Sequence, residues 1–404
     1  MDATGDQSRP DTDHSAGASV LGYLHQTRWG LLELLESRKS DPSRTLTLEM
    51  HDDIAWDESG TPTELKQLKL HVSALRNLTD ASDDMWRTLR VWMDNGRPKD
   101  PYGPILTLIT NSSAGTGSAA SHLRTSDRDV PTALAKLEKI AREADAKGTR
   151  KAREQFLELT PAERRTFVER IYVADQSLDM DGVDEEVANH LRPGAPRDTQ
   201  QFEAYMDLVW GWWAKTSISM LSGKRSSISV EEMLAALERI RDQFTLDNLP
   251  SLVDIDEIDV NAVLQLHEGR PYIQQLKLLR MRTRQLHHAI LDYQRAYLQD
   301  TRWLDVHLVD YDELEKFSAD LVDEWDRAFE YMCSELPDDA SEDDKRAAGR
   351  RLLQALSDSA LSIRTRFQEP FHARGKRHEL ADLQKIGWHP QFKEHLEQLL
   401  LLGA

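Results

Sequence analysis

The chain has 404 residues, a formal net charge of −19 and one cysteine, Cys333. A chain of this length is expected to form two or three domains. A single cysteine excludes an internal disulfide framework and a zinc site built on several cysteines. No apolar run approaches the roughly 18 residues of a membrane span, and the polar N-terminus lacks the pattern of a signal peptide. We therefore expect a cytoplasmic protein without a membrane partner.

The acidic net charge disfavours nucleic acid as a partner for most of the surface. At physiological salt, however, the Debye length is about 8 Å, so distant acidic helices have little effect on a locally basic groove. The charge lowers the expectation of DNA binding but does not exclude it.

The first third of the chain shows alternating helix and strand patterns. Residues 1–17 are polar and predicted to be disordered, and leucines at helical spacing over 20–36 predict an amphipathic helix. Strict alternation in TLTLEM indicates a strand, residues 53–56 begin a second, and TELKQLKLHV returns as a third after the turn ESGTP. In this third strand Leu68, Leu70 and Val72 lie on one face, and Gln67, Lys69 and His71 on the other.

A helix follows in MWRTLRVWMDN, opened by the Thr/Asp-rich LTDASDD and ended by Gly96. ILTLIT at 105–110 is a continuous apolar strand suited to the centre of a sheet. After about residue 130 strand signals nearly vanish, and TPAERRTFVERIYV and SVEEMLAALERIRDQF both predict helices. The predicted fold is an α/β domain with a mixed sheet flanked by helices, followed by mostly α-helical middle and C-terminal regions.

Five polar side chains could converge at one end of the first hairpin: Glu49, Asp52, Asp53, Gln67 and Lys69. A short hairpin brings the start of the second strand beside the third, and the i, i+2 spacing of Gln67 and Lys69 puts both on one face. Two carboxylates and an amide oxygen can hold Mg²⁺ against a scissile phosphate, and a lysine can orient the attacking water. An exposed polar strand face without catalysis is the alternative reading of the same spacing.

GYLHQTRWGLLELLE, LTLEMHDDI, LKQLKLHV, LTDASDDMWRTLRVW and ILTLITNSSAGTGSAASHLR occur in this order. Together they resemble the double-stranded DNA endonuclease domain of the restriction-endonuclease-like PD-(D/E)xK superfamily, of the kind found in CD-NTase-associated antiphage effector nucleases. The resemblance implies that Glu49, Asp53 and Gln67 hold Mg²⁺ or Mn²⁺ and that Lys69 completes the catalytic set. Asp52 is an alternative first ligand to Asp53. Gln67 stands in place of the superfamily's usual acid, which matches its Mrr-like branch.

RPYIQQLKLLRMRTRQLHHAILDYQRAYLQDTRWL, ELEKFSADLVDEWDRAF and GKRHELADLQKIGWHPQF are similar to the C-terminal domain of effector subunits in ABC three-component defence systems, the Lamassu group. This resemblance implies an SMC-like ATPase subunit and a small accessory subunit as partners, and an active homo-oligomer, a tetramer or another even-numbered assembly. We accordingly expect an endonuclease core at 18–130, a helical extension of it at 131–250, and a helical assembly or oligomerisation domain at 251–404.

Four further residues are candidates for supporting roles. His71 and Gln26 could steady the metal site, although an exposed histidine and a surface glutamine need no such role. Arg87 and Arg90, three apart on a helix, could contact DNA phosphates, although a solvated face accounts for either. Trp388-His389-Pro390 is interpreted as a structural turn rather than a metal or catalytic motif.

Three functions remain open at this level. The first is a metal-dependent DNA endonuclease that partners restrain and self-association activates. The second is a catalytically inactive adaptor with a nuclease fold, although such an adaptor has no physical reason to keep Lys69 beside carboxylates. The third is a nuclease triggered by a cyclic nucleotide, but the C-terminal third does not resemble the ligand-binding domain that this route uses. SGKRSS at 222–227 lacks the phosphate-cradling Gly-x-x-x-x-Gly-Lys-[Ser/Thr] pattern, so ATP hydrolysis would fall to a partner.

Overall fold

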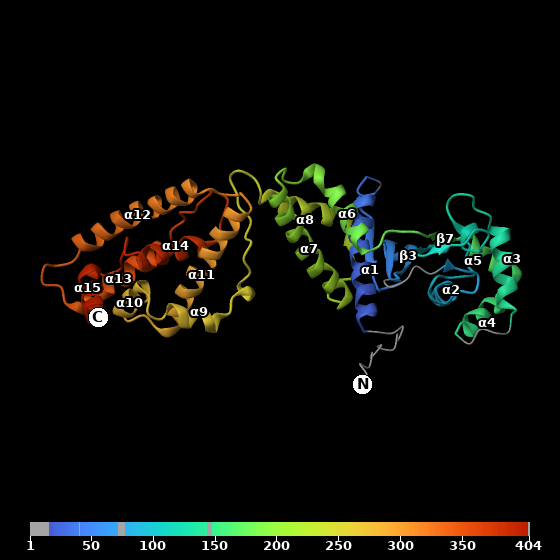
Figure 1. Ribbon diagram of the computed structural model, residues 1–404, viewed down its shortest axis with the longest axis horizontal. Coiled ribbons are helices and arrows are strands. Elements are labelled where there is room, and N and C mark those ends of the chain that lie inside the picture. Colours follow the sequence, from blue (N-terminus) through green and yellow to red (C-terminus); the bar gives the residue numbers. More distant parts are fainter. Residues whose placement is uncertain (1–15, 40, 72–76, 144–147, 403–404) are drawn as a thin grey trace, which may run out of the picture. The chain divides into compact units, whose positions relative to one another are not determined.

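The computed structural model describes residues 16–39, 41–71, 77–143 and 148–402, and it confirms the predicted fold class (Figure 1). The chain forms two compact units. Unit 1 comprises the described residues up to Gly194 together with Leu208–Glu238, and unit 2 comprises Ala195–Asp207 and Arg239–Ala404. Residues 1–15, predicted to be disordered, lie outside the described part of the chain, whereas the next two already belong to a helix.

A six-stranded mixed sheet forms the centre of unit 1, in the order β7-β5-β3-β2-β1-β8. The strands β8, β1, β2 and β3 pair antiparallel, whereas β3, β5 and β7 run parallel. Two further short strands, β4 and β6, pair with each other in a separate parallel sheet. The strands are β1 Thr45–Leu48, β2 Ile54–Glu58, β3 Thr61–Lys69, β4 Asn77–Leu78, β5 Ile105–Thr110, β6 Ser113–Ala114, β7 Ile171–Ala174 and β8 Ile228–Ser229.

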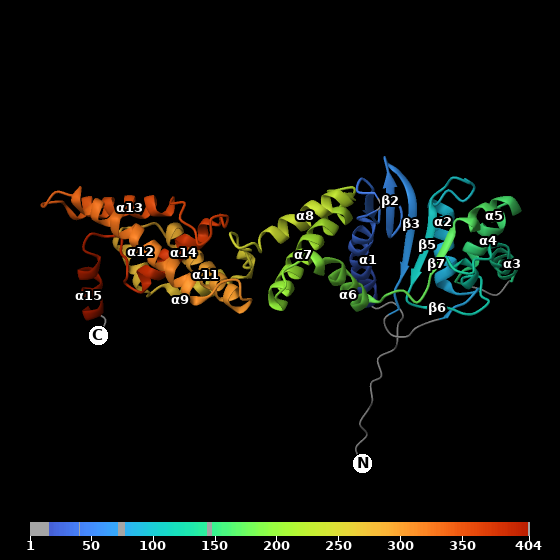
Figure 2. The ribbon, with the colours of Figure 1, turned by 90° about the horizontal axis from the view of Figure 1, so that it is seen from above.

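Helices cover both faces of this sheet, as the edge-on view in Figure 2 shows. On one face α1 lies close to the sheet, since a Cβ at Gly30 would be 3.3 Å from the side chain of Leu48. On the other face Leu65 and Leu106 pack with buried residues of α2 to α5. The helices of this part are α1 Ala16–Ser37, α2 Asp83–Asn95, η1 Ser121–Leu123, α3 Val130–Ala141, α4 Arg150–Glu158, α5 Pro161–Glu169, α6 Met180–Leu191 and η2 Arg192–Gly194, with α7 Thr199–Leu221 and α8 Val230–Asp242 crossing the unit boundary.

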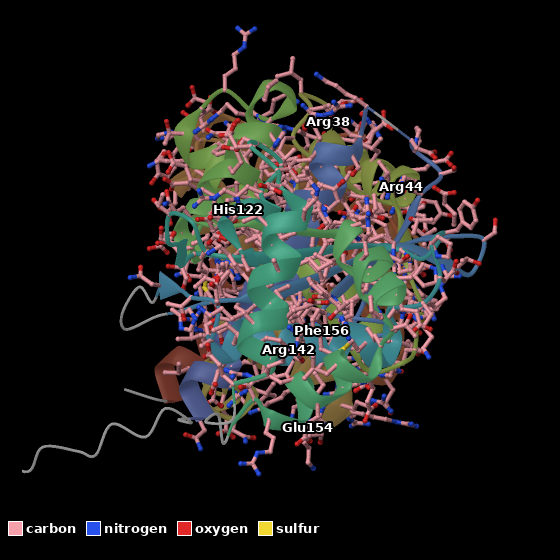
Figure 3. The ribbon with its side chains drawn as sticks, turned by 90° about the vertical axis from the view of Figure 1, so that its right-hand side faces the viewer. Arg38, Arg44, His122, Arg142, Glu154 and Phe156 are labelled. Carbon is pink, nitrogen blue, oxygen red and sulfur yellow. The ribbon has the colours of Figure 1, made fainter. Side chains whose placement is uncertain are left out.

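The first helix of the outer layer illustrates how local signals and packing agree. Gly96 ends α2 with its N–H on the carbonyl of Trp92, as the sequence predicts, whereas the N-cap is Ser82, which accepts the Met85 N–H, and not the expected Thr or Asp. Trp86 of α2 meets Phe156 of α4 edge to face, with ring centroids 5.8 Å apart. In Figure 3, which faces α3, Phe156 lies within this helical layer, whereas Glu154 of the same helix lies at its edge.

The helix predicted to extend through TPAERRTFVERIYV is wrong at its end. A capping box between Thr160 and Glu163 starts α5, but the helix stops at Glu169 and Ile171–Ala174 forms β7. Four apolar or aromatic residues directly after a helix carry no period that separates a strand from a helical turn. Pairing with β5 decides between them. The short strand β8 was missed because its two residues stand directly before the helix α8 and are too few to show a period.

All secondary-structure elements in the described residues of unit 2 are helices, and they share a core around Leu276, Ile290, Trp325 and Trp388. The closest helix contact is that of α14 on α11, where a Cβ at Gly375 would lie 2.0 Å from the Asp292 carbonyl oxygen. Among the described residues, no helix has the length and apolar character that a membrane crossing requires. The elements are η3 Ile255–Glu257, α9 Val260–His267, α10 Pro271–Leu278, α11 Thr283–Asp305, α12 Tyr311–Ser334, α13 Glu342–Ser357, α14 Pro370–Asp382 and α15 Phe392–Leu402.

Candidate functional site

Asp53, Gln67 and Lys69 meet where β2 begins beside β3. The register pairs Ile54 with Lys66, so the preceding Asp53 falls beside Gln67 on the opposite sheet face from Lys66. One oxygen of Asp53, Oδ2, accepts the Leu68 N–H at 2.7 Å, and Gln67 also hydrogen-bonds the carboxylate. Burial raises the pKa of Asp53, with Glu49 adding to the rise, whereas Lys69 and these hydrogen bonds oppose it. The grouping expected from the hairpin is therefore present.

Glu49 reaches the same place from the end of β1. Its backbone N–H donates to the Asp53 carbonyl at 3.2 Å, and its side-chain Oε1 accepts from Gln26 Nε2 of α1 at 2.9 Å. Glu49 is exposed and has a φ of 55°, in the left-handed region that non-glycine residues seldom occupy. The strain of such a conformation is of order 1–3 kcal/mol. A buried glutamine and a strained backbone thus hold this carboxylate beside Asp53.

Asp52 has a different environment from Asp53. Its side chain is only 7% exposed; Oδ2 accepts from Trp92 Nε1 at 2.6 Å and Oδ1 accepts the Asp53 N–H at 3.0 Å. Burial, with the neighbouring Asp53 charge, raises the pKa of Asp52 to about 7, although the hydrogen bonds and Lys69 oppose the rise. Both carboxylate oxygens are engaged by protein donors. This geometry favours Asp53 over Asp52 as the residue that faces a ligand.

A charged cluster on the opposite sheet face sets the position of α1. Glu33 is buried and accepts from Lys66 Nζ at 2.6 Å, Trp56 Nε1 at 3.2 Å and Trp29 Nε1 at 3.0 Å. Burial lowers the pKa of Lys66, but Glu33 and Glu64 outweigh this effect and raise it overall. Because Gln26 lies two turns before Glu33, the same contacts place Gln26 opposite Glu49. The sequence did not reveal this cluster, since its members lie in three separate elements.

His71 does not continue the polar face of Gln67 and Lys69, because β3 ends at Lys69. Its ring nitrogen Nε2 lies 2.7 Å from Asp84 Oδ2 in the first turn of α2. Its backbone exchanges two hydrogen bonds with the Asn111 side chain, at 3.0 and 2.8 Å. His71 and Asn111 therefore tie together the carboxyl ends of β3 and β5. Asn111 was missed, although a polar residue directly after a buried parallel strand is a recognisable signal.

The two arginines predicted to contact DNA lie on α2. Arg87 is exposed and pairs with Asp83 at 3.4 Å, a spacing of i, i+4. Arg90 is also exposed. Neither geometry distinguishes a phosphate contact from an ordinary solvated helix face.

The donor atoms at this site suit a hard divalent cation. Glu49 and Asp53 supply carboxylate oxygens and Gln67 an amide oxygen, which are the ligand types that Mg²⁺ and Mn²⁺ prefer. Lys69 is next to them on the same strand face, where its charge can act on a phosphate as well as on Asp53. The residues present therefore fit a Mg²⁺ or Mn²⁺ site.

A second cluster, in unit 2, has metal-like spacing. Among the described residues, only Glu342, His389 and His395 form a His/Cys/Asp/Glu group whose potential ligand atoms all lie within 4.8 Å of one another. However, His389 Nδ1 accepts the Gln391 N–H at 3.1 Å, so the neutral ring carries its proton on Nε2, the atom that faces Glu342. Arg346 also lies 3.1 Å from the same Glu342 oxygen. Both features oppose a cation at this position.

The C-terminal region supplies the match to a known family. Residues 272–396, from α10 into α15, match the family model for C-terminal domain 7 of the ABC-three component (ABC-3C) systems. This similarity to the ABC-three component systems covers the C-terminal region only. The matched region and the candidate metal site belong to different units, because the site lies entirely in unit 1. A comparison with curated proteins finds no match to the chain.

Proposed function

We propose that this chain is a metal-dependent DNA endonuclease and the effector subunit of a Lamassu-like ABC-three component system. The observation that carries the proposal is that Asp53, Gln67 and Lys69 meet on one face of the sheet, with Glu49 held beside them by Gln26. A site with a purely structural role would not require a glutamate in the left-handed backbone conformation, nor a buried glutamine to hold its side chain. The order of elements, helix, three antiparallel strands, helix and parallel strand, agrees with the resemblance to the PD-(D/E)xK superfamily.

Glu49, Asp53 and the Gln67 amide oxygen would hold Mg²⁺ or Mn²⁺. Bound metal supplies Lewis-acid stabilisation of the scissile phosphate and a more acidic water. Asp53 is the better first ligand, since Asp52 has both oxygens engaged by Trp92 and its neighbour's N–H. The hydrogen bonds from Leu68 and Gln67 fix the orientation of Asp53 before substrate arrives.

Lys69 would act on the substrate directly. Its ammonium group lies on the strand face of Gln67, where it can donate to the attacking water and offset the charge that develops on the phosphate. Gln26 has a positioning role, because it contacts Glu49 and not the reacting atoms. His71 supports the same end of the sheet through Asp84 and Asn111.

The rest of the proposal concerns control of the activity. An unrestrained DNA endonuclease in the cytoplasm would damage its own cell, so we propose that an SMC-like ATPase and a small accessory subunit hold the chain inactive. Release would allow self-association into a tetramer or another even-numbered assembly, which places active sites on both DNA strands. The net charge of −19 agrees with weak DNA binding by a single subunit until several basic grooves act together.

The test is cleavage of linear and supercoiled double-stranded DNA by the purified chain, over a range of protein concentrations, with Mg²⁺ or EDTA. We expect metal-dependent cutting that rises steeply with concentration and is lost in Lys69→Ala. Lys99→Ala is the matched control, because Lys99 belongs to the same unit but its side chain is 66% exposed and pairs with Glu163. If Lys69→Ala cuts as fast as the control, the proposed chemistry is wrong. If neither cuts, the assay is repeated with the ATPase complex and DNA ends, and silence there supports an adaptor.

A further inference from the structure

A long groove in unit 2 lies outside the candidate metal site. It has a volume of about 1270 Å³ and is lined by one face each of α11 and α12 and by the end of α14. Leu304, Val322 and Leu383 contribute accessible apolar surface to its lining, whereas Leu314 and Leu380 are buried beneath it. Two large aromatic side chains at the groove are solvent-exposed, Tyr297 by 53% and Tyr311 by 75%. All residues of the groove fall within the region matched by the family model.

The dimensions of the groove suit a helix. On α12 the lining residues recur at helical spacing from Tyr311 to Asp326, which corresponds to about 22 Å of helix length. On α11 they recur from Tyr297 to Asp305 with the same spacing. A groove of this length with apolar and acidic side chains in its lining can receive an amphipathic helix, as hydrophobic grooves do in other complexes.

The charges around the groove are mainly negative. Seven of its side chains are acidic and three are lysines. Lys376 is buried and already pairs with Asp300 at 2.8 Å and Glu379 at 2.6 Å, so it offers little charge to a ligand. Within the part of the chain that the structure describes, Asp312, Glu315 and Asp326 on α12 form no ion pair. These exposed carboxylates give the α12 wall of the groove an excess of negative charge, although Arg327 lies near Asp326 and Lys316 also lines the wall.

We propose that this groove binds a basic amphipathic helix of another protein. The accessible apolar side chains would receive the apolar face of that helix, Tyr297 and Tyr311 would cover its ends, and the α12 carboxylates would pair with its lysines or arginines. The local charge selects this occupant, because seven of the ten charged side chains that line the groove are acidic and would be complementary to lysines or arginines on a bound helix. The inference concerns unit 2 and does not depend on nuclease chemistry, so the two proposals can fail separately.

The probe is a synthetic helix of about 18 residues with leucines at i, i+3, i+4 and i+7 and lysines on both flanks. Binding to the full chain is measured by calorimetry and mapped by hydrogen exchange. We expect saturable binding that protects 297–305 and 311–326. The double variant Asp312→Lys/Asp326→Lys should weaken it at least about tenfold. The matched control is Asp338→Lys/Asp339→Lys, which changes the net charge equally at exposed positions beyond α12.

Several outcomes would overturn the proposal. Equal loss of binding in both double variants would mean that the peptide senses only the overall acidity. If a peptide with glutamate in place of lysine binds equally well, charge does not select the ligand. If no saturable binding is found up to about 1 mM peptide, the groove is not a helix-binding site. A change in oligomeric state of the peptide-free groove variant, measured by sedimentation, would assign the groove to a second copy. DNA cleavage by the groove variant should equal that of the unmodified chain.

Discussion

The buried Asp52 carboxyl should make the stability of unit 1 depend on pH. Its pKa of about 7 in the folded chain compares with about 3.9 in an unfolded one. Between these two pKa values the folded state binds more protons than the unfolded state, so the free energy of unfolding falls as pH rises. This loss of stability is complete above about pH 7. The difference corresponds to about 4 kcal/mol at most.

Asp52→Asn removes this ionisation while keeping the shape of the side chain. The substitution replaces one carboxylate oxygen with an amide NH₂ group, so either Trp92 Nε1 or the Asp53 N–H loses its acceptor. The loss of this hydrogen bond costs about 1–3 kcal/mol of stability. At pH 8.5 the variant should therefore be more stable than the unmodified chain by about 2 kcal/mol. At pH 4.5, where the Asp52 carboxyl is protonated in the folded state, it should be less stable by about 1–2 kcal/mol.

The assay is calorimetric melting of both proteins in EDTA at the two pH values. For a unit of this size about 2 kcal/mol corresponds to a change of about 4–8 °C in Tm, so the difference between variant and unmodified chain should reverse sign. Glu154→Gln, at an exposed position on α4, is the control and should show no reversal. If the Tm difference for Asp52→Asn is the same at both pH values, burial does not control the ionisation of Asp52 and the reasoning is refuted.

Three other predictions follow from the site. Glu49→Gly and Glu49→Ala should both abolish metal-dependent cleavage, but the glycine variant should be more stable by about 1 kcal/mol in urea unfolding because it relieves the φ of 55°; equal stability would contradict the strained backbone. Lys66→Met leaves the buried Glu33 charge unpaired and should lower the free energy of unfolding by about 3–5 kcal/mol in the same urea experiment. The second substitution Glu33→Gln should restore part of this stability, and a loss below about 1 kcal/mol for Lys66→Met would mean that the pair does not hold α1. Gln26→Ala should raise the Mg²⁺ concentration needed for half-maximal cleavage about 10-fold or more with little change in Tm, whereas Gln200→Ala, an exposed control, should change neither.

The amino-acid sequence by itself determined the elements whose residues are close in the chain. Alternation over 45–48 and 61–69, the capping of α2 and the apolar run of β5 specify those elements, because period, caps and turns are local properties. The hairpin between β2 and β3 also brings Asp53 beside Gln67 and Lys69 through its register alone. For this reason the centre of the candidate site could be predicted.

Tertiary structure alone decided the contacts between distant segments. Trp92 meets Asp52 across 40 positions, and this contact favours Asp53 as the residue that faces a ligand, a choice that spacing left open. Gln26 reaches Glu49 because a buried Glu33–Lys66 pair sets the position of α1. The strand β7 exists because β5 offers an edge to pair with, and the groove of unit 2 exists because α11, α12 and the end of α14 come together around it. Such features depend on burial and partners that no local pattern encodes.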